Sequence, residues 1–126
     1  IFSLINQLIF QSTNPVAVEQ AIWIANAYME EVLSKPFYDP TTGTICPAAP
    51  SNRADFDNVC DYSGLSESPT DQNGNAISLL SDYQADISVT PVANWQNMPE
   101  QVLRVVVTIS HNNIPDLIIQ AYKAPL

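Results

Sequence analysis

Basic residues are scarce in this 126-residue chain. Four Lys and Arg residues stand against thirteen Asp and Glu residues, which gives a formal net charge of −9 at pH 7. A surface with this balance repels the phosphates of nucleic acids and anionic membrane surfaces. The sequence therefore predicts no nucleic-acid partner, and its length and 46% hydrophobic content fit one folded domain.

Recognisable catalytic motifs are also missing. The chain has one histidine, His111, and it has no Gly-x-Ser-x-Gly motif and no phosphate-binding glycine loop followed by Lys. His111 begins the turn-like segment HNNIPD, where a solvated imidazole is commoner than a general base. Glu30 and Glu31 are sequence neighbours, so they point in different directions from a helix and cannot form a facing carboxylate pair. We expect no enzymatic activity.

Only two cysteines are present, Cys46 and Cys60, and they lie in a segment rich in Pro, Asn and Asp. No histidine is near them, which favours a disulfide over a zinc site and implies an oxidising compartment. Two free thiols in a cytosolic protein are the alternative. A disulfide would close the middle of the long irregular segment 36–82 and stabilise it by on the order of 3 kcal/mol.

The longest periodic stretch is VAVEQAIWIANAYMEEVLS, between Pro15 and Pro36. Pro15 suits the first position of a helix, and Pro36 disfavours its continuation. We predict an amphipathic helix over 15–35. Its core-facing stripe is expected to hold Val18, Ala21, Ile22, Ala25, Met29, Val32 and Leu33.

The opposite side of this helix is only partly polar. Trp23, Ile24 and Tyr28 interrupt or border its polar stripe. A helix that is apolar around most of its circumference needs cover on more than one side, so another partner is expected there. We expect Ile24 and Tyr28 to be more exposed than the stripe that faces the core.

Three acidic residues occur close together after the helix, Asp55, Asp57 and Asp61. Such an oxygen-rich run could hold Ca²⁺, but its spacing does not fit an EF-hand loop. Side chains that cap the backbone of the loop are the simpler explanation, so no cofactor is expected and Ca²⁺ is the alternative. The apolar residues among them are expected to anchor the loop to the core: Phe56, Val59 and Tyr62.

The last part of the chain, 83–126, has the two-residue period of half-buried strands. Apolar and polar residues alternate over 83–90 and again over 103–110, and 117–123 gives a third strand after the HNNIPD turn. One helix laid on an antiparallel meander is an α+β fold.

The chain opens with IFSLINQLIF, which is apolar but too short to cross a bilayer alone, since about 20 residues are needed. It lacks the basic start and cleavage site of a secretory signal. We interpret 1–14 as the remnant of a longer hydrophobic helix, and a short arm on the surface of the domain is the alternative.

This order of parts resembles the type IV pilin family. The segments AIWIANAYMEEVLSKPFYDP, RADFDNVCDYSGL, DQNGNAI and LSDYQADISVTPV are similar to minor pilins of the mannose-sensitive haemagglutinin pilus. The resemblance implies a single pilin-like domain, 1–126, with a long N-terminal helix packed on an antiparallel sheet and a disulfide-stapled loop between them. The start Phe2-Ser3-Leu4-Ile5 superficially echoes the start of a mature pilin, but Asn6 stands where the family has a glutamate. The alignment of 1–10 with the distal end of the family's hydrophobic helix is better, so we expect that glutamate to lie before Ile1.

The resemblance further implies a structural and assembly subunit that takes part in pilus biogenesis and surface attachment. Such subunits sit in the inner membrane, facing the periplasm, through their N-terminal helix and then join the extracellular pilus. Their partners are other pilin and minor pilin subunits, with surface glycans as a further target of adhesion. In this interpretation Ile24, Tyr28 and Glu31 are the expected subunit contacts.

Two other functions remain open. A minor pseudopilin of a type II secretion system would have the same fold in another machine. A secreted carbohydrate-binding module would use Trp95, Tyr38 or Tyr62 as a stacking platform.

Overall fold

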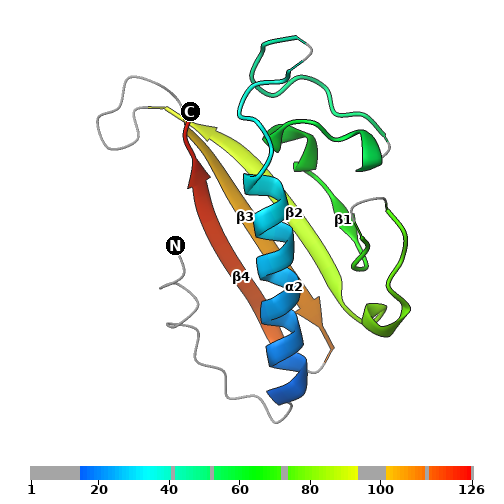
Figure 1. The fold of residues 1–126 in the computed structure, drawn as a ribbon. Coiled ribbons are helices and arrows are strands. Elements are labelled where there is room, and N and C mark those ends of the chain that lie inside the picture. Colours follow the sequence, from blue (N-terminus) through cyan, green and yellow to red (C-terminus); the bar gives the residue numbers. More distant parts are fainter. Residues whose placement is uncertain are drawn as a thin grey trace.

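A computed structural model describes residues 15–40, 42–51, 53–71, 74–93, 102–112 and 114–125. The described chain forms one α-helix, α2 (Pro15–Leu33), and the strands β1 (Ser66–Glu67), β2 (Gln84–Val92), β3 (Val102–His111) and β4 (Ile114–Lys123). Three short 3₁₀ helices join them, η1 (Arg53–Asp55), η2 (Val59–Tyr62) and η3 (Ser78–Leu80). The helix lies across one face of the sheet (Figure 1), which confirms the α+β class. The expected helical remnant at 1–14 lies outside the described residues.

The sheet follows chain order, β1-β2-β3-β4, and each strand runs antiparallel to its neighbour. β2 and β3 pair from Gln84 opposite Ser110 to Val92 opposite Val102. Buried and more exposed residues alternate along β3, as its period-two pattern predicts. The expected HNNIPD turn is shorter than predicted, because β3 continues to His111 and β4 begins at Ile114.

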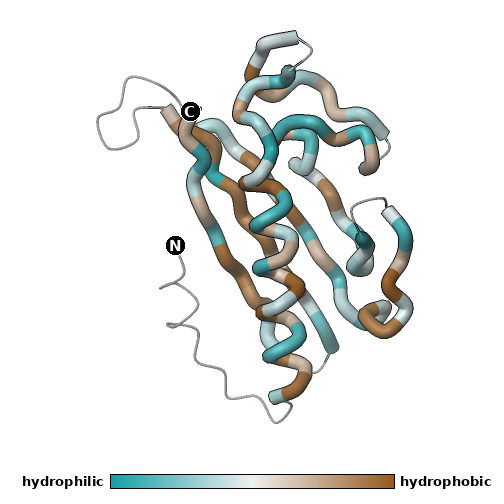
Figure 2. The backbone as a smooth tube through the Cα atoms, viewed as in Figure 1, coloured by the Kyte–Doolittle hydropathy of each residue, from teal (hydrophilic) through white to brown (hydrophobic). Residues whose placement is uncertain are grey.

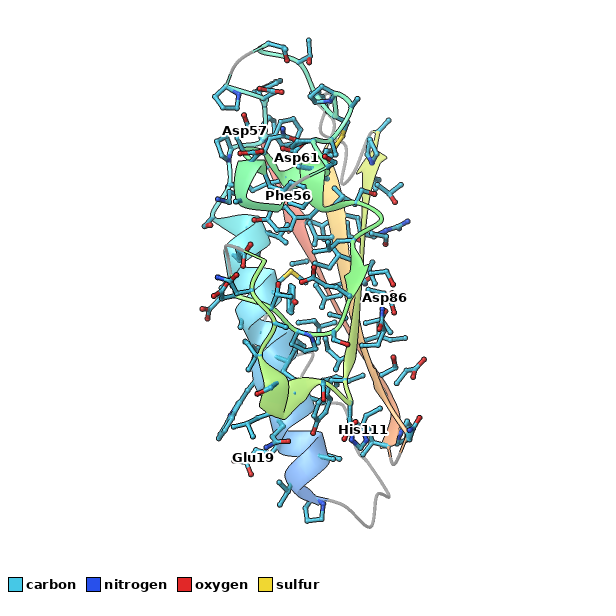
Figure 3. The ribbon with its side chains drawn as sticks, turned by 90° about the vertical axis from the view of Figure 1, so that its right-hand side faces the viewer. Glu19, Phe56, Asp57, Asp61, Asp86 and His111 are labelled. Atoms are coloured by element: carbon cyan, nitrogen blue, oxygen red, sulfur yellow. A yellow bond between two sulfur atoms is a disulfide. The ribbon has the colours of Figure 1, made fainter. Side chains whose placement is uncertain are left out.

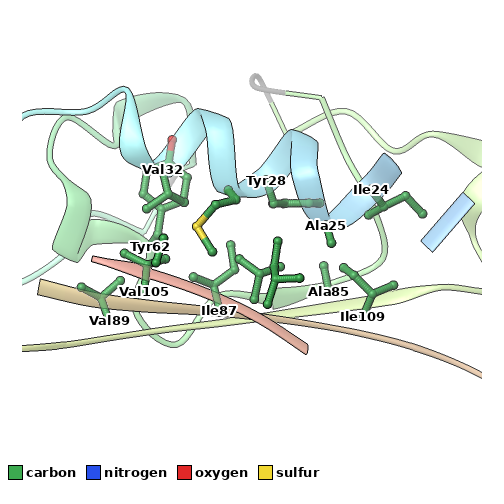
Figure 4. Packing of buried hydrophobic residues seen from close by; sticks show 14 of the residues in the cluster. Ile24, Ala25, Tyr28, Val32, Tyr62, Ala85, Ile87, Val89, Val105 and Ile109 are labelled. Atoms are coloured by element: carbon green, nitrogen blue, oxygen red, sulfur yellow. The ribbon is translucent and has the colours of Figure 1, made fainter. Parts of the chain in front are cut away.

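The core lies between α2 and the sheet. In the close-up, helix side chains such as Ala25 and Val32 point toward Ile87, Val105 and Ile109 of the strands (Figure 4). Figure 2 shows hydrophobic stretches as brown bands along the helix and the strands. The side chains of β3 that face this layer are among the most deeply buried: Leu103, Val105, Val107 and Ile109, each 0% exposed.

The loop 36–82 lies beside the helix and joins the sheet. The backbone N–H of Gly64 donates to the carbonyl of Ile87, and the N–H of Ile87 donates to the carbonyl of Leu65, both at 2.9 Å. β1 thus adds a fourth strand that the sequence pattern did not predict. The predicted disulfide is confirmed, since Cys46 and Cys60 are bonded with their Cα atoms 4.9 Å apart.

A lysine from the sheet contacts the C-terminal end of α2. No basic residue lies in the last turn of α2. Instead, Nζ of Lys123 on β4 donates to the carbonyl oxygen of Leu33 at 3.1 Å. This places a positive charge against the negative end of the helix dipole and fixes α2 relative to β4.

Candidate functional site

Exposed hydrophobic side chains mark the outer side of α2. Val16 is 62% exposed and Trp23 is 64% exposed. They share this side with the exposed Glu19 and Glu30. Because an indole carries a large apolar surface, a tryptophan left this open on a helix is typical of a surface that another molecule covers.

The segment 77–80 brings further hydrophobic side chains to the same side. Leu79 is 92% exposed and Ile77 is 38% exposed. The N–H of Ile77 donates to the carbonyl of Pro69 at 3.1 Å, and the N–H of Leu80 donates to the carbonyl of Ile77 at 2.9 Å, which fixes this turn. Helix and turn together form a groove of about 290 Å³, called the Trp23 groove below, lined by Gln20, Trp23, Ile24, Ile77, Leu79 and Leu80.

The residues that line the Trp23 groove carry no charge, although the chain has a net charge of −9. Its polar lining residue, Gln20, accepts a hydrogen bond through Oε1 from the Tyr83 hydroxyl at 2.7 Å. Burial, helped by the charge of Asp82, raises the pKa of Tyr83, so this hydroxyl keeps its proton and continues to donate. The groove offers no titratable or nucleophilic lining side chain, and its chemistry suits apolar contact.

The expected exposure of Ile24 and Tyr28 is wrong. Ile24 is 6% exposed and Tyr28 is 4% exposed, and both belong to the hydrophobic core, whereas Ile22 is only partly buried. The physical reason is the loop. The Tyr28 hydroxyl donates to Oε2 of Glu67 at 2.7 Å and accepts the N–H of Thr70 at 3.1 Å, so the chain itself covers this flank of the helix.

Glu31, the third expected contact, is half-buried. Its Oε2 accepts a hydrogen bond from the Tyr62 hydroxyl at 2.6 Å. Tyr62 is 1% exposed and therefore cannot stack on a sugar, but it anchors the loop as expected. Tyr38 is 45% exposed and packs edge-on against Phe37, with ring centroids 4.9 Å apart. Trp95 lies outside the described residues.

Two of the three candidate Ca²⁺ ligands lie together in the loop, near η2 (Figure 3). The backbone N–H of Asp57 donates to Oδ2 of Asp61 at 2.9 Å, and Nδ2 of Asn58 donates to Oδ1 of Asp57 at 3.0 Å. Asp55 is exposed on η1. Burial raises the pKa of Asp61, although the hydrogen bond from the Asp57 backbone opposes this shift. Across the described ranges, no three His, Cys, Asp or Glu side chains are grouped to hold a metal.

His111 lies half-buried at the end of β3. Its ring packs against Tyr83, with the ring centroids 4.5 Å apart and the planes tilted by 41°. Figure 3 places it near the start of the helix, at the opposite end of the molecule from Asp57 and Asp61. The structure therefore does not bring the histidine and the clustered acidic residues into one site.

Comparison with known proteins adds no relative. No family model, curated protein or solved structure matches this chain. Within the parts of the chain that the structure describes, α2 included, no helix has both the length and the hydrophobicity that crossing a bilayer requires.

Proposed function

We propose that this chain is a minor pilin, a structural and assembly subunit of a type IV pilus that contributes to pilus biogenesis and surface attachment. The observation that carries the proposal is the Trp23 groove, an uncharged apolar surface on the open side of a helix that lies on an antiparallel sheet. Filament subunits associate by burying such surfaces. The segments similar to minor pilins support the same assignment.

Trp23 and Leu79 are the expected anchors of the contact. Burying each of them against a partner contributes on the order of 2 kcal/mol. The net charge of −9 repels a second identical copy, but charges more than about 8 Å apart are largely screened at physiological salt. Because the chain is acidic, the contacting surface of the partner is expected to be apolar or basic. In this proposal the partner is another pilin or minor pilin subunit.

The disulfide supports the location that this function requires. A bond between Cys46 and Cys60 is stable in the periplasm and outside the cell, but not in a reducing cytosol. In our proposal the protein is held at the inner membrane through hydrophobic sequence N-terminal to α2. It then passes into the pilus on the cell surface.

The test uses full-length protein with substitutions at exposed positions. Trp23→Ser combined with Leu79→Ser removes both anchors of the groove. Ile118→Ser is the matched control, because Ile118 is 53% exposed on β4, outside the groove lining. Each exposed change should alter the free energy of unfolding by less than about 1 kcal/mol. Only the groove variant should be missing from sheared, purified pili and impair surface attachment.

The outcomes separate the alternatives. Wild-type protein that never copurifies with pili contradicts the proposal. Loss of exported proteins from the medium, with pili intact, instead assigns the chain to the pseudopilins of a type II secretion system. Normal incorporation of the groove variant removes the groove as the subunit contact.

A further inference from the structure

Two buried side-chain oxygens in the loop have no hydrogen-bond partner among the described residues, Oδ1 of Asn58 and Oδ1 of Asp61. Asn58 is 0% exposed and Asp61 is 2% exposed. Nearly all buried polar atoms in folded proteins have a partner, because an unpaired buried oxygen loses its hydration without compensation. Two such oxygens in one short segment need an explanation, and a bound ligand would supply one.

Hydrogen bonds hold both of these side chains against Asp57. Nδ2 of Asn58 donates to Oδ1 of Asp57 at 3.0 Å, and Oδ2 of Asp61 accepts the backbone N–H of Asp57 at 2.9 Å. These bonds use Nδ2 of Asn58 and Oδ2 of Asp61, and the Oδ1 atom of each side chain remains without a partner among the described residues. Asp57 is only half-buried, so the segment from Asp57 to Asp61 is open to solvent at Asp57.

Asp57 and Asp61 place two like charges near each other in this part of the loop. The charged group that acts on Asp61 among the described side chains is Asp57, which is also negative. A bound cation would give the two unpaired oxygens a partner.

We propose that Asp57, Asn58 and Asp61 form a binding site for a divalent cation of the Ca²⁺ class. Ca²⁺ accepts carboxylate, amide and water oxygens in irregular geometry, which suits two carboxylates and one amide with water on the open side. Asn58 thus takes the place that the sequence pattern gave to Asp55. This inference stands independently of the proposed role in a pilus.

The test measures Ca²⁺ binding to the purified chain after removal of metal with EDTA and dialysis. Isothermal titration of CaCl₂ is compared for wild type, Asp61→Asn and Asp55→Asn at constant ionic strength. Asp61→Asn keeps the size of the side chain and an oxygen for the N–H of Asp57, so the fold is preserved. Asp55→Asn makes the same change of charge at an exposed neighbouring position.

Wild type and Asp55→Asn should bind Ca²⁺ with a dissociation constant of about 0.1–1 mM, as extracellular modules do. Asp61→Asn should bind at least about tenfold more weakly, since one of two carboxylates is lost. At a Ca²⁺ concentration ten times the dissociation constant, the ratio of folded to unfolded wild type should rise about 11-fold. The melting temperature should then rise by about 5 °C, and EDTA should reverse the shift.

Three results overturn the proposal. In the first, wild type shows neither heat of binding nor a change of melting temperature with Ca²⁺. In the second, Asp61→Asn binds Ca²⁺ as tightly as wild type. In the third, acid stabilises wild type while Ca²⁺ does not. A proton on Asp61, and not a cation, then satisfies the buried carboxyl group.

Discussion

The hydroxyl of Tyr28 donates a hydrogen bond of 2.7 Å to Oε2 of Glu67, 39 residues further along the chain. The same hydroxyl accepts the backbone N–H of Thr70 at 3.1 Å, and Oγ1 of Thr70 donates to Oε2 of Glu67 at 2.7 Å. This network fastens the middle of α2 to β1 and to the segment after it. One flank of the helix is therefore covered by the loop of its own chain.

Tyr28→Phe removes this hydroxyl and leaves the N–H of Thr70 without its acceptor. The free energy of unfolding should fall by about 1–2 kcal/mol, because the half-buried Tyr28–Thr70 and Tyr28–Glu67 hydrogen bonds are lost. Tyr38→Phe is the control at an exposed ring and should change stability by less than about 0.5 kcal/mol. Urea denaturation measures both. Equal effects of the two substitutions would show that the network does not stabilise the fold.

The parts of the fold that depend on local pattern were predictable. The alternation in 103–110 fixes which side chains of β3 face the helix, and Pro15 and Pro36 bracket α2. The disulfide was predictable because Cys46 and Cys60 are the only cysteines. Each of these signals is contained in a short stretch of sequence or in the composition.

The exposed side of the helix was not predictable from periodicity alone. Ile22 and Ile24 are about 200° apart around the helix, and both are apolar. Ile24 lies beside Ile77 and Leu80, which reach the helix only after the loop has folded back. The two residues of β1 are likewise too few to show a period.

Only some residues of the Trp23 groove and of the proposed cation site could be predicted from the sequence. Trp23 could be found in the sequence, because it interrupts the polar stripe of the helix. Leu79 could not, since its place in the groove depends on how η3 lies against α2. Asn58 was missed because asparagine is usually exposed, and its burial arises from the packing of the loop.

Removal of the disulfide should loosen the loop more than the sheet. Cys46→Ser combined with Cys60→Ser is expected to lower the free energy of unfolding by roughly 2–4 kcal/mol, mostly through greater freedom of the unfolded chain. Hydrogen exchange should show lost protection around η2 while β3 stays protected. Mass spectrometry of non-reduced peptides should link Cys46 to Cys60 in the wild type, and free thiols in protein from the periplasm would contradict the bond.

The buried carboxyl of Asp61 should make stability depend on pH. Its pKa is raised above the usual value of 3.8, chiefly by burial, so the folded state holds this proton more tightly than the unfolded chain. The stability that protonation provides is full below pH 3.8 and is lost as the pH rises through the raised pKa. Asp61→Asn removes this loss. In EDTA, the variant should gain stability relative to wild type as the pH increases toward neutrality.

Urea denaturation of both proteins across this pH range measures the effect. The difference in the free energy of unfolding between variant and wild type should be smallest in acid and should grow with pH. A difference that does not change with pH would show that Asp61 ionises in the folded protein as it does in the unfolded chain.

Two neighbouring residues of α2 should lose very different amounts of stability on the same substitution. Ile24 is 6% exposed within the core, and Trp23 is 64% exposed beside it. Ile24→Asp buries an unpaired charge and should lower the free energy of unfolding by more than about 3 kcal/mol. Trp23→Asp should cost less than about 1 kcal/mol, part of it from repulsion by Glu19 four residues earlier on the helix.

Thermal melting followed by circular dichroism compares the two variants, and the pilus assay compares their full-length forms. Trp23→Asp should melt close to wild type but fail to enter pili, because a charge in the Trp23 groove must be desolvated when a partner docks. If Trp23→Asp unfolds the domain, the indole stabilises the isolated fold and no partner is needed to explain it. If it folds and enters pili normally, the exposed indole is ordinary surface, and the pilin proposal keeps only its fold and its resemblance.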